Sequence, residues 1–178
     1  MLKQLKPKLS YFYVKALLDI VGRSLVSASQ VDAKIQKEIA KFPVGYCFSM
    51  NVFSSDLAFY AQVTEQQQLR LLSAREAQQQ GVDLEIQFKH LNHAFLVLSF
   101  QESTAKAFAN DRMIVNGDLA YAVKLVRCLN QLESIILPKV LATLAVKEYP
   151  NSLQVKEKLL LAGRIYGQVV KSYLPLKK

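Results

Sequence analysis

Five residues stand out in this chain of 178 because their types and spacing could do chemistry. His90 and His93 lie three positions apart, so on a helix they would share one face and could supply two metal ligands. No carboxylate or third histidine follows at a compelling spacing, which favours surface or hydrogen-bonded histidines. Cys47 and Cys128 lie in apolar surroundings without a partner at metal-ligand spacing. They indicate two buried free thiols in a reducing compartment.

The fifth residue, Asp118, has a structural use that its neighbours indicate. Gly117 permits backbone angles that other residues resist, and a long apolar run follows Asp118, so this carboxylate suits a helix cap better than a general base. The two cysteines have no readable partner for nucleophilic catalysis, and Gly81 and Gly117 each stand alone, so no phosphate-binding loop is indicated. We therefore expect a noncatalytic protein without a metal site.

The elements around Gly117 organise the chain between Ala107 and Leu137. The dipeptide Asn110-Asp111 is a turn signal, and Arg112–Asn116 is a short apolar strand. The helix after Asp118 has more apolar surface than packing on a sheet requires: Leu119, Tyr121, Ala122, Val123, Leu125, Val126, Leu129, Leu132, Ile135, Ile136 and Leu137. This excess predicts an apolar interior that holds something besides side chains.

Four further strands are predicted before this region. Apolar residues alternate from Val44 to Val52, and the segments 57–63, 69–74 and 82–88 are also typical of strands. Short polar separators suit hairpins, so we expect the first four strands to pair in consecutive antiparallel order. A helix is predicted over 89–100 and a shorter one over 104–108.

Helices are predicted at both ends of the chain. Helical spacing runs from Leu9 to Val26 and from Gln30 to Lys41, and again over 140–146 and 153–173 after the break at Pro138. Two interpretations of the first pair stay open: the helices pad the sheet, or they form an amphipathic arm that lies on a membrane or covers a lipid entrance.

The net charge of +9 belongs to the two ends of the chain. Residues 1–41 carry +5 and residues 139–178 carry +6, whereas residues 42–138 carry −2. This asymmetry predicts an anionic partner where the termini lie. We expect an anionic membrane surface, contacted by Lys3, Lys6, Lys8, Lys15, Lys177 and Lys178. Nucleic acid is the less favoured partner, because the basic residues are not interleaved with exposed aromatic side chains on strands.

A targeting segment is not indicated. Lys15, Asp19 and Arg23 interrupt the stretch that would be the apolar region of a signal peptide, and no run reaches eighteen apolar residues. We expect a cytoplasmic protein that associates peripherally with the inner face of the membrane.

The order of these elements resembles the sterol carrier protein type-two domain. The resemblance covers about residues 42–138 and lies in four meandering strands, an apolar helix, Ala107-Phe108, a fifth strand and Gly117-Asp118 opening an apolar helix. The added N-terminal helices, with Leu132-Glu133 followed by Pro138-Lys139, are similar to a bacterial subgroup, the accessory lipid carrier of oxygen-independent ubiquinone biosynthesis. Asn110-Asp111 stands where many members have a glycine.

The resemblance implies an α+β fold, with a five-stranded, mainly antiparallel sheet and helices on one face enclosing an apolar tunnel. It divides the chain into an N-terminal helical arm (1–41), a lipid-binding core (42–138) and a basic C-terminal helical extension (139–178). The residues placed at the tunnel are Phe95, Leu98, Phe108, Met113, Leu119, Val123, Leu129, Leu132, Ile136 and Val140.

The function implied is that of a noncatalytic lipid carrier. No cofactor is expected besides a bound lipid or quinone-type ligand, with a polyprenylated ubiquinone intermediate as the leading ligand and ubiquinone-biosynthesis proteins as partners. The alternatives left open are phospholipid binding and transfer at a membrane surface, a scaffold for biosynthetic partners, and a nucleic-acid-binding module.

Overall fold

The computed structural model describes residues 7–99, 101–136 and 168, so the helices predicted beyond residue 137 lie outside the described residues. Within that range the elements are α1 (Pro7–Val31), α2 (Ala33–Ile39), β1 (Cys47–Val52), β2 (Ala58–Val63), β3 (Leu69–Leu72), α3 (Ala74–Gln80), β4 (Leu84–Phe88), α4 (Leu91–Leu98), α5 (Thr104–Ala109), β5 (Met113–Asn116) and α6 (Leu119–Ile136). The five predicted strands are all present, and the α+β class is confirmed.

The five strands form one open sheet in the order β3-β2-β1-β4-β5. All neighbouring pairs are antiparallel except β1 and β4, which run parallel with Phe48 opposite Leu84. The prediction of four consecutive antiparallel strands was therefore wrong, because β4 lies beside β1 and not beside β3. The chain passes from β3 to β4 through α3, and a capping box formed by Ser73 and Glu76 stabilises the start of this helix.

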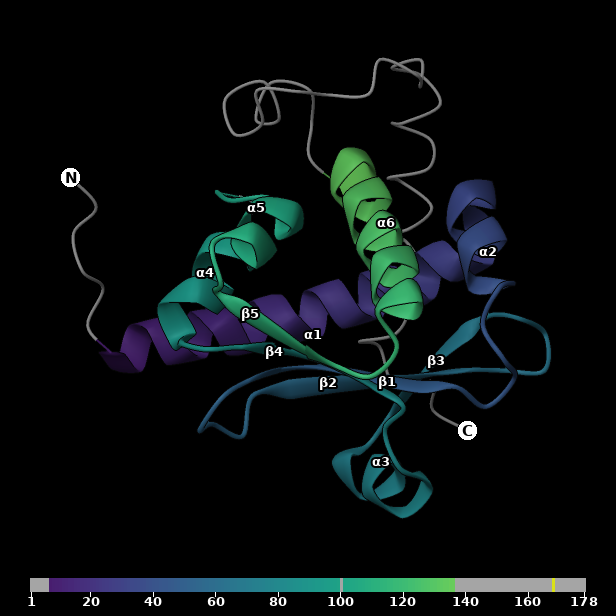
Figure 1. Cartoon of the computed structure of the whole chain (residues 1–178), viewed down its shortest axis with the longest axis horizontal. Coiled ribbons are helices and arrows are strands. Elements are labelled where there is room, and N and C mark those ends of the chain that lie inside the picture. The colour runs from purple at the N-terminus through teal and green to yellow at the C-terminus, as the bar shows by residue number, and fades with distance from the viewer. Residues whose placement is uncertain (1–6, 100, 137–167, 169–178) are drawn as a thin grey trace.

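The helices lie mainly on one face of the sheet. Figure 1 shows α2, α4, α5 and α6 above the sheet, α1 running behind the strands, and α3 below the sheet. Below the sheet, α3 covers a small cluster of Cys47, Leu72 and Ala77. The prediction of helices on one face is thus confirmed for the main layer, and α3 is an additional element that the sequence prediction missed.

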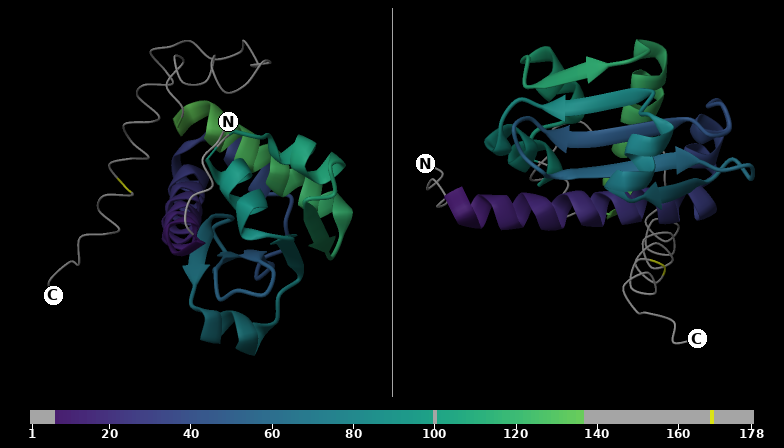
Figure 2. Two further views of the ribbon diagram at one scale, coloured as in Figure 1. Left: turned by 90° about the vertical axis from the view of Figure 1, so that its left-hand side faces the viewer. Right: turned by 90° about the horizontal axis from the view of Figure 1, so that it is seen from below.

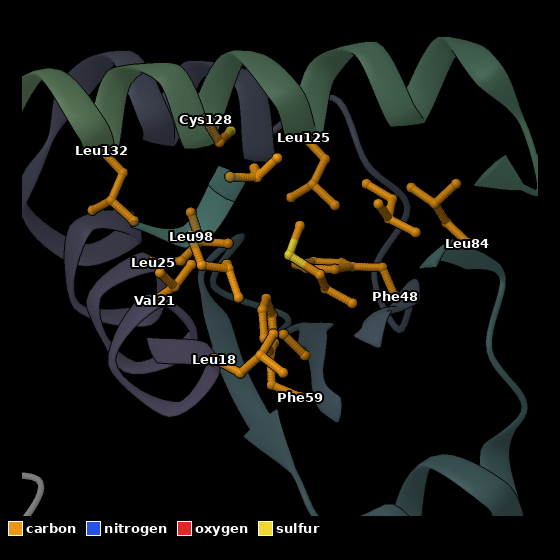
Figure 3. Close-up of a cluster of buried hydrophobic side chains, with 14 of the residues drawn as sticks. Leu18, Val21, Leu25, Phe48, Phe59, Leu84, Leu98, Leu125, Cys128 and Leu132 are labelled. Carbon is orange, nitrogen blue, oxygen red and sulfur yellow. The ribbon is translucent and has the colours of Figure 1, made fainter. Parts of the chain in front are cut away.

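The first helix is part of the main core. Its buried side chains Val14, Leu18, Val21 and Leu25 follow the helical period and belong to the same cluster as the sheet residues. Figure 2 shows α1 running alongside the sheet. Figure 3 shows one cluster in which side chains of α1, such as Leu18 and Leu25, lie near Phe59 and Leu132, while Leu125 of α6 lies over Phe48.

The junction between β5 and α6 is closely fitted. Gly117 has φ +125°, and a Cβ atom there would lie 2.5 Å from the carbonyl oxygen of Asp83. This position therefore requires glycine. Asp118 accepts a hydrogen bond from the backbone amide of Ala120 at 2.7 Å, which confirms its role at the start of α6. Asp111, with φ +56°, confirms the predicted turn before β5.

Candidate apolar binding groove

An apolar groove of about 290 Å³ lies where α5, β5 and the first turns of α6 meet. Its lining comes from three stretches of the chain: Thr104, Ala105 and Phe108 from α5, Val115 from β5, and Leu119, Ala122, Val123, Val126 and Arg127 from α6. Most of these side chains are hydrocarbon, and Arg127 supplies the cationic group. Such a lining suits an apolar ligand that carries a polar or anionic end.

Local structure explains why these side chains share one surface. Leu119, Val123 and Val126 repeat at helical spacing on α6, so they lie along one face of that helix. On the opposite wall, Ser103 caps α5 by accepting a hydrogen bond from the backbone amide of Lys106. The cap fixes the start of the helix that carries Phe108.

The groove exposes large apolar side chains to solvent. The exposed fraction is 48% for Phe108, 57% for Leu119 and 44% for Val123. Scattered apolar side chains are ordinary on a protein surface, but three large ones that line a common groove indicate a binding surface.

A second, much smaller space lies deeper in the molecule. This void of about 20 Å³ is lined by side chains from α1, β1, α4, α5 and α6, namely Val21, Met50, Val97, Leu98, Thr104, Leu129, Leu132 and Glu133. Thr104 lines both the void and the groove. Burial raises the pKa of Glu133 to about 7, so a large part of its population is uncharged at neutral pH.

The structure distributes the ten predicted tunnel residues over several places. Phe108, Leu119 and Val123 line the groove, and Leu98, Leu129 and Leu132 line the inner void. Met113 is buried in β5, and Phe95 packs against Tyr13 with ring centroids 5.3 Å apart. The side chain of Ile136 and all of Val140 lie outside the described residues. In the described part, the apolar space includes an open groove and a smaller void that share Thr104.

Several groove residues were missed by the sequence prediction. Ala122 and Val126 share the helical face of Leu119 and Val123, so the 3.6-residue period alone could have found them. Nothing in the sequence marks Ala105, Val115 or Arg127, because the packing of α5 and β5 against α6 decides which of their side chains face the groove.

The histidines lie together but carry no further ligand group. The rings of His90 and His93 stand 5.0 Å apart, and burial, followed by the charges of His90 and Arg112, lowers the pKa of His93. Within the described residues, no group of three or more His, Cys, Asp or Glu side chains could hold a metal ion.

The cysteines are both buried and free, as predicted. Burial, with the nearby charges of Glu38 and Asp32, raises the pKa of Cys128 to about 12. Burial also raises the pKa of Cys47, where the charge of Asp83 adds to the effect. A thiol with a raised pKa stays protonated at neutral pH and is a poor nucleophile.

The predicted membrane-docking lysines are described only in part. Lys15 is exposed on α1, and Lys8 belongs to α1 without a described side chain. Lys3, Lys6, Lys177 and Lys178 lie outside the described residues. Among the helices of the described range, none has the length and apolarity that crossing a bilayer requires.

Comparison with solved structures finds sterol carrier proteins at low sequence identity. The chain is similar to the apo form of Sterol Carrier Protein 2 from Yarrowia lipolytica, with 13% identity, a TM-score of 0.45 and coverage of 65% of this chain and 88% of that one. It is similar to a UbiJ-SCP2 ubiquinone synthesis protein, with 12% identity, a TM-score of 0.43 and coverage of 74% and 97%. It is also similar to Sterol Carrier Protein 2 Like 2 from Aedes aegypti, with 15% identity, a TM-score of 0.32 and coverage of 57% of this chain and 94% of that one.

No protein-family model and no curated protein sequence matches the chain.

Proposed function

We propose that this protein is a noncatalytic lipid carrier that holds the apolar chain of its ligand in the groove between α5, β5 and α6. The single observation that supports this most directly is the groove itself, because Phe108, Leu119 and Val123 are large, apolar and exposed on its walls. A protein does not gain stability by leaving such side chains in water, and a bound hydrocarbon chain would cover them.

The size of the groove suits one section of a lipid chain. Its volume of about 290 Å³ is near the lower end of the range of about 300–1,000 Å³ that is usual for ligand pockets. Burial contributes about 0.8 kcal/mol per methylene, so a section of about eight carbons represents roughly 6 kcal/mol before binding costs. Release into water would be slow, and loading therefore belongs at a membrane or at a partner protein.

The leading ligand is a polyprenylated intermediate of ubiquinone synthesis. This choice comes from the resemblance of the added N-terminal helices, and of Leu132-Glu133 followed by Pro138-Lys139, to the bacterial accessory lipid carrier. Such a ligand has an uncharged aromatic head and a long prenyl tail, and the tail would contact the apolar walls of the groove.

A phospholipid is the second candidate, and Arg127 favours it. The side chain of Arg127 lines the groove and is 60% exposed, and its Nη1 lies 3.8 Å from Oε2 of Glu38. A guanidinium group binds phosphate oxygens in a bidentate geometry, so Arg127 could meet an anionic head at the rim. In either case, we expect the basic ends of the chain to bring the carrier to an anionic membrane surface.

The experiment that tests the carrier function compares two valine variants. Val123→Glu places a charge on the groove wall, whereas Val82→Glu makes the same change at a site that is similarly exposed and lies outside the groove. Purified proteins are extracted with organic solvent for mass spectrometry, and binding of a fluorescent long-chain probe is measured by displacement. We expect Val123→Glu to lose at least tenfold in affinity and Val82→Glu to match the wild type.

The outcome that contradicts the proposal is equally specific. Equal binding by folded Val123→Glu and wild type would remove the groove as the lipid site, and an extract without lipid together with no probe binding would remove the carrier function. Leu132 is a poor choice for this test, since it is 2% exposed and a charge there would disrupt the core itself. Displacement by a polyprenylphenol or by a phosphatidic acid distinguishes the two ligand classes.

A further inference from the structure

One carboxyl group borders the apolar interior without a partner. Glu133, near the end of α6, lines the small inner void together with seven other residues, of which only Thr104 is also polar. Within the described residues its carboxyl forms no hydrogen bond and no ion pair, and burial alone raises its pKa. An unpartnered carboxyl in apolar surroundings lowers the stability of the fold, so its presence indicates a use other than folding.

The inner void follows the groove along α6. Val126 lines the groove, Leu129 and Glu133 line the void further along the same helix, and Thr104 lines both spaces. From Val126 to Glu133 the helix rises by about 10 Å. A ligand chain that lies in the groove along α6 can therefore reach the void with one of its ends.

The size of the void limits what that end can be. Its volume is about 20 Å³, and a cavity needs about 10–15 Å³ to hold one water molecule. The void thus has room for a single oxygen-sized group and is too small for a phosphate or a sugar. The side chains of Thr104 and Glu133 offer hydrogen-bond donors and acceptors to a group of this size. A hydroxyl satisfies both conditions.

The charge of the ligand's end is limited as well. A hydroxyl can accept a hydrogen bond from the protonated Glu133 carboxyl and can donate one to the ionised form, so it is a partner in either state. A carboxylate end suits only the protonated form, because two like charges repel strongly in apolar surroundings. Among the described residues that line the void, none is basic, so an anionic end would have no compensating charge.

We propose that the inner void binds the hydroxyl end of the ligand, with Glu133 and Thr104 as hydrogen-bonding partners, so that the protein selects long-chain ligands that end in an uncharged hydroxyl. This inference rests on the proposed function, since the chain of the ligand lies in the groove. It makes Glu133 a specificity-determining residue. A phospholipid would instead place its head at Arg127, on the wall of the groove.

The experiment compares two ligands that differ only at one end. Dodecanol and dodecanoate displace an uncharged fluorescent long-chain alcohol from the full-length protein at pH 6 and at pH 8.5, and the affinity of the probe is measured separately at each pH. These values lie on either side of the pKa of Glu133, which is about 7, whereas dodecanoate is ionised at both. We expect the wild type to bind dodecanol equally at both pH values and to lose about tenfold or more in dodecanoate affinity at pH 8.5.

Three variants separate the carboxyl from the rest of the fold. Glu133→Gln keeps a donor and an acceptor but cannot ionise, so it should bind dodecanol like wild type and dodecanoate equally at both pH values. Glu133→Leu should lose about fivefold in dodecanol affinity, because the hydroxyl then has no carboxyl partner. Glu65→Gln, at an exposed loop position, is the matched control and should keep the wild-type pH profile. Circular dichroism establishes that each variant is folded.

Three results would overturn the inference while leaving the carrier function intact. They are the same pH dependence of dodecanoate binding in wild type and folded Glu133→Gln, undiminished dodecanol affinity in folded Glu133→Leu, and a preference of the wild type for dodecyl phosphate over dodecanol at pH 8.5. The last would place the head of the ligand at Arg127. In each case the probe still binds, whereas a wild type that does not bind the probe would overturn the carrier function and this inference together.

Discussion

Replacing Glu133 by glutamine should make the protein more stable at neutral and mildly alkaline pH. Burial raises the pKa of this carboxyl from 4.5 to about 7. The folded protein therefore keeps a proton that the unfolded chain has already released, and stability falls as pH rises from about 4.5 to about 7, then levels off. At about 1.4 kcal/mol per pKa unit the full shift corresponds to roughly 3 kcal/mol.

The expected effect is smaller than this ceiling because Glu133 is only partly buried and water reduces the penalty of its charge. We expect Glu133→Gln to exceed the wild type by about 1–2 kcal/mol in free energy of unfolding above pH 7, and to equal it near pH 4.5. Urea titrations across this pH range measure the difference in free energy of unfolding between Glu133→Gln and wild type. The other carboxylates titrate alike in both proteins, so their contribution cancels in this difference. Glu65→Gln, at an exposed loop position, is the control. Parallel pH profiles for Glu133→Gln and wild type would refute the reasoning.

Three further predictions concern single contacts. Gly117→Ala should lower the free energy of unfolding by more than about 1–3 kcal/mol, which is the usual cost of a strained backbone conformation. The additional loss arises because the new Cβ atom would lie 2.5 Å from the carbonyl oxygen of Asp83. Gly45→Ala, at positive φ in open space, is its control, and equal losses of melting temperature would contradict the clash. Ser73→Ala removes the capping box of α3 and should lower the free energy of unfolding by about 1 kcal/mol; an unchanged urea midpoint would show that α3 does not need it. Lys124→Met removes an ammonium group that lies 4.1 Å from the centre of the Tyr121 ring, and should cost roughly 0.5–1 kcal/mol in urea unfolding; no loss would argue against this cation–π contact.

The sequence predicts local structure here better than it predicts the pairing of strands. The residue types of Gly117 and Asp118 alone predict a positive-φ turn and a helix cap, and both predictions are confirmed. The position of β4 in the sheet was not predicted correctly, because a polar stretch after β3 can begin either a hairpin or a crossover connection. The signal that could have separated them was Ser73 followed by Glu76, which has the spacing of a capping box and marks the start of α3.

The candidate site was harder to predict than the fold. Apolar periodicity identifies residues that avoid water, and it does not distinguish a side chain in a filled core from one on the wall of a groove. Leu132 and Val123 both follow the period of α6, yet Leu132 is 2% exposed and Val123 is 44% exposed. The difference arises because α1 and the sheet cover one part of α6 and leave its beginning open beside Phe108. Such coverage is a property of the tertiary arrangement, which no single helix encodes.

The position of α1 also has a consequence for how the chain is made. Residues of α1 pack on β2 and β3 and also contact α4 and α6, so its cover is completed by segments that leave the ribosome much later. During synthesis, Val14, Leu18, Val21 and Leu25 remain uncovered until those segments emerge. The packing of α1 is therefore completed late, and its apolar face remains exposed to solvent until α4 and α6 have been made.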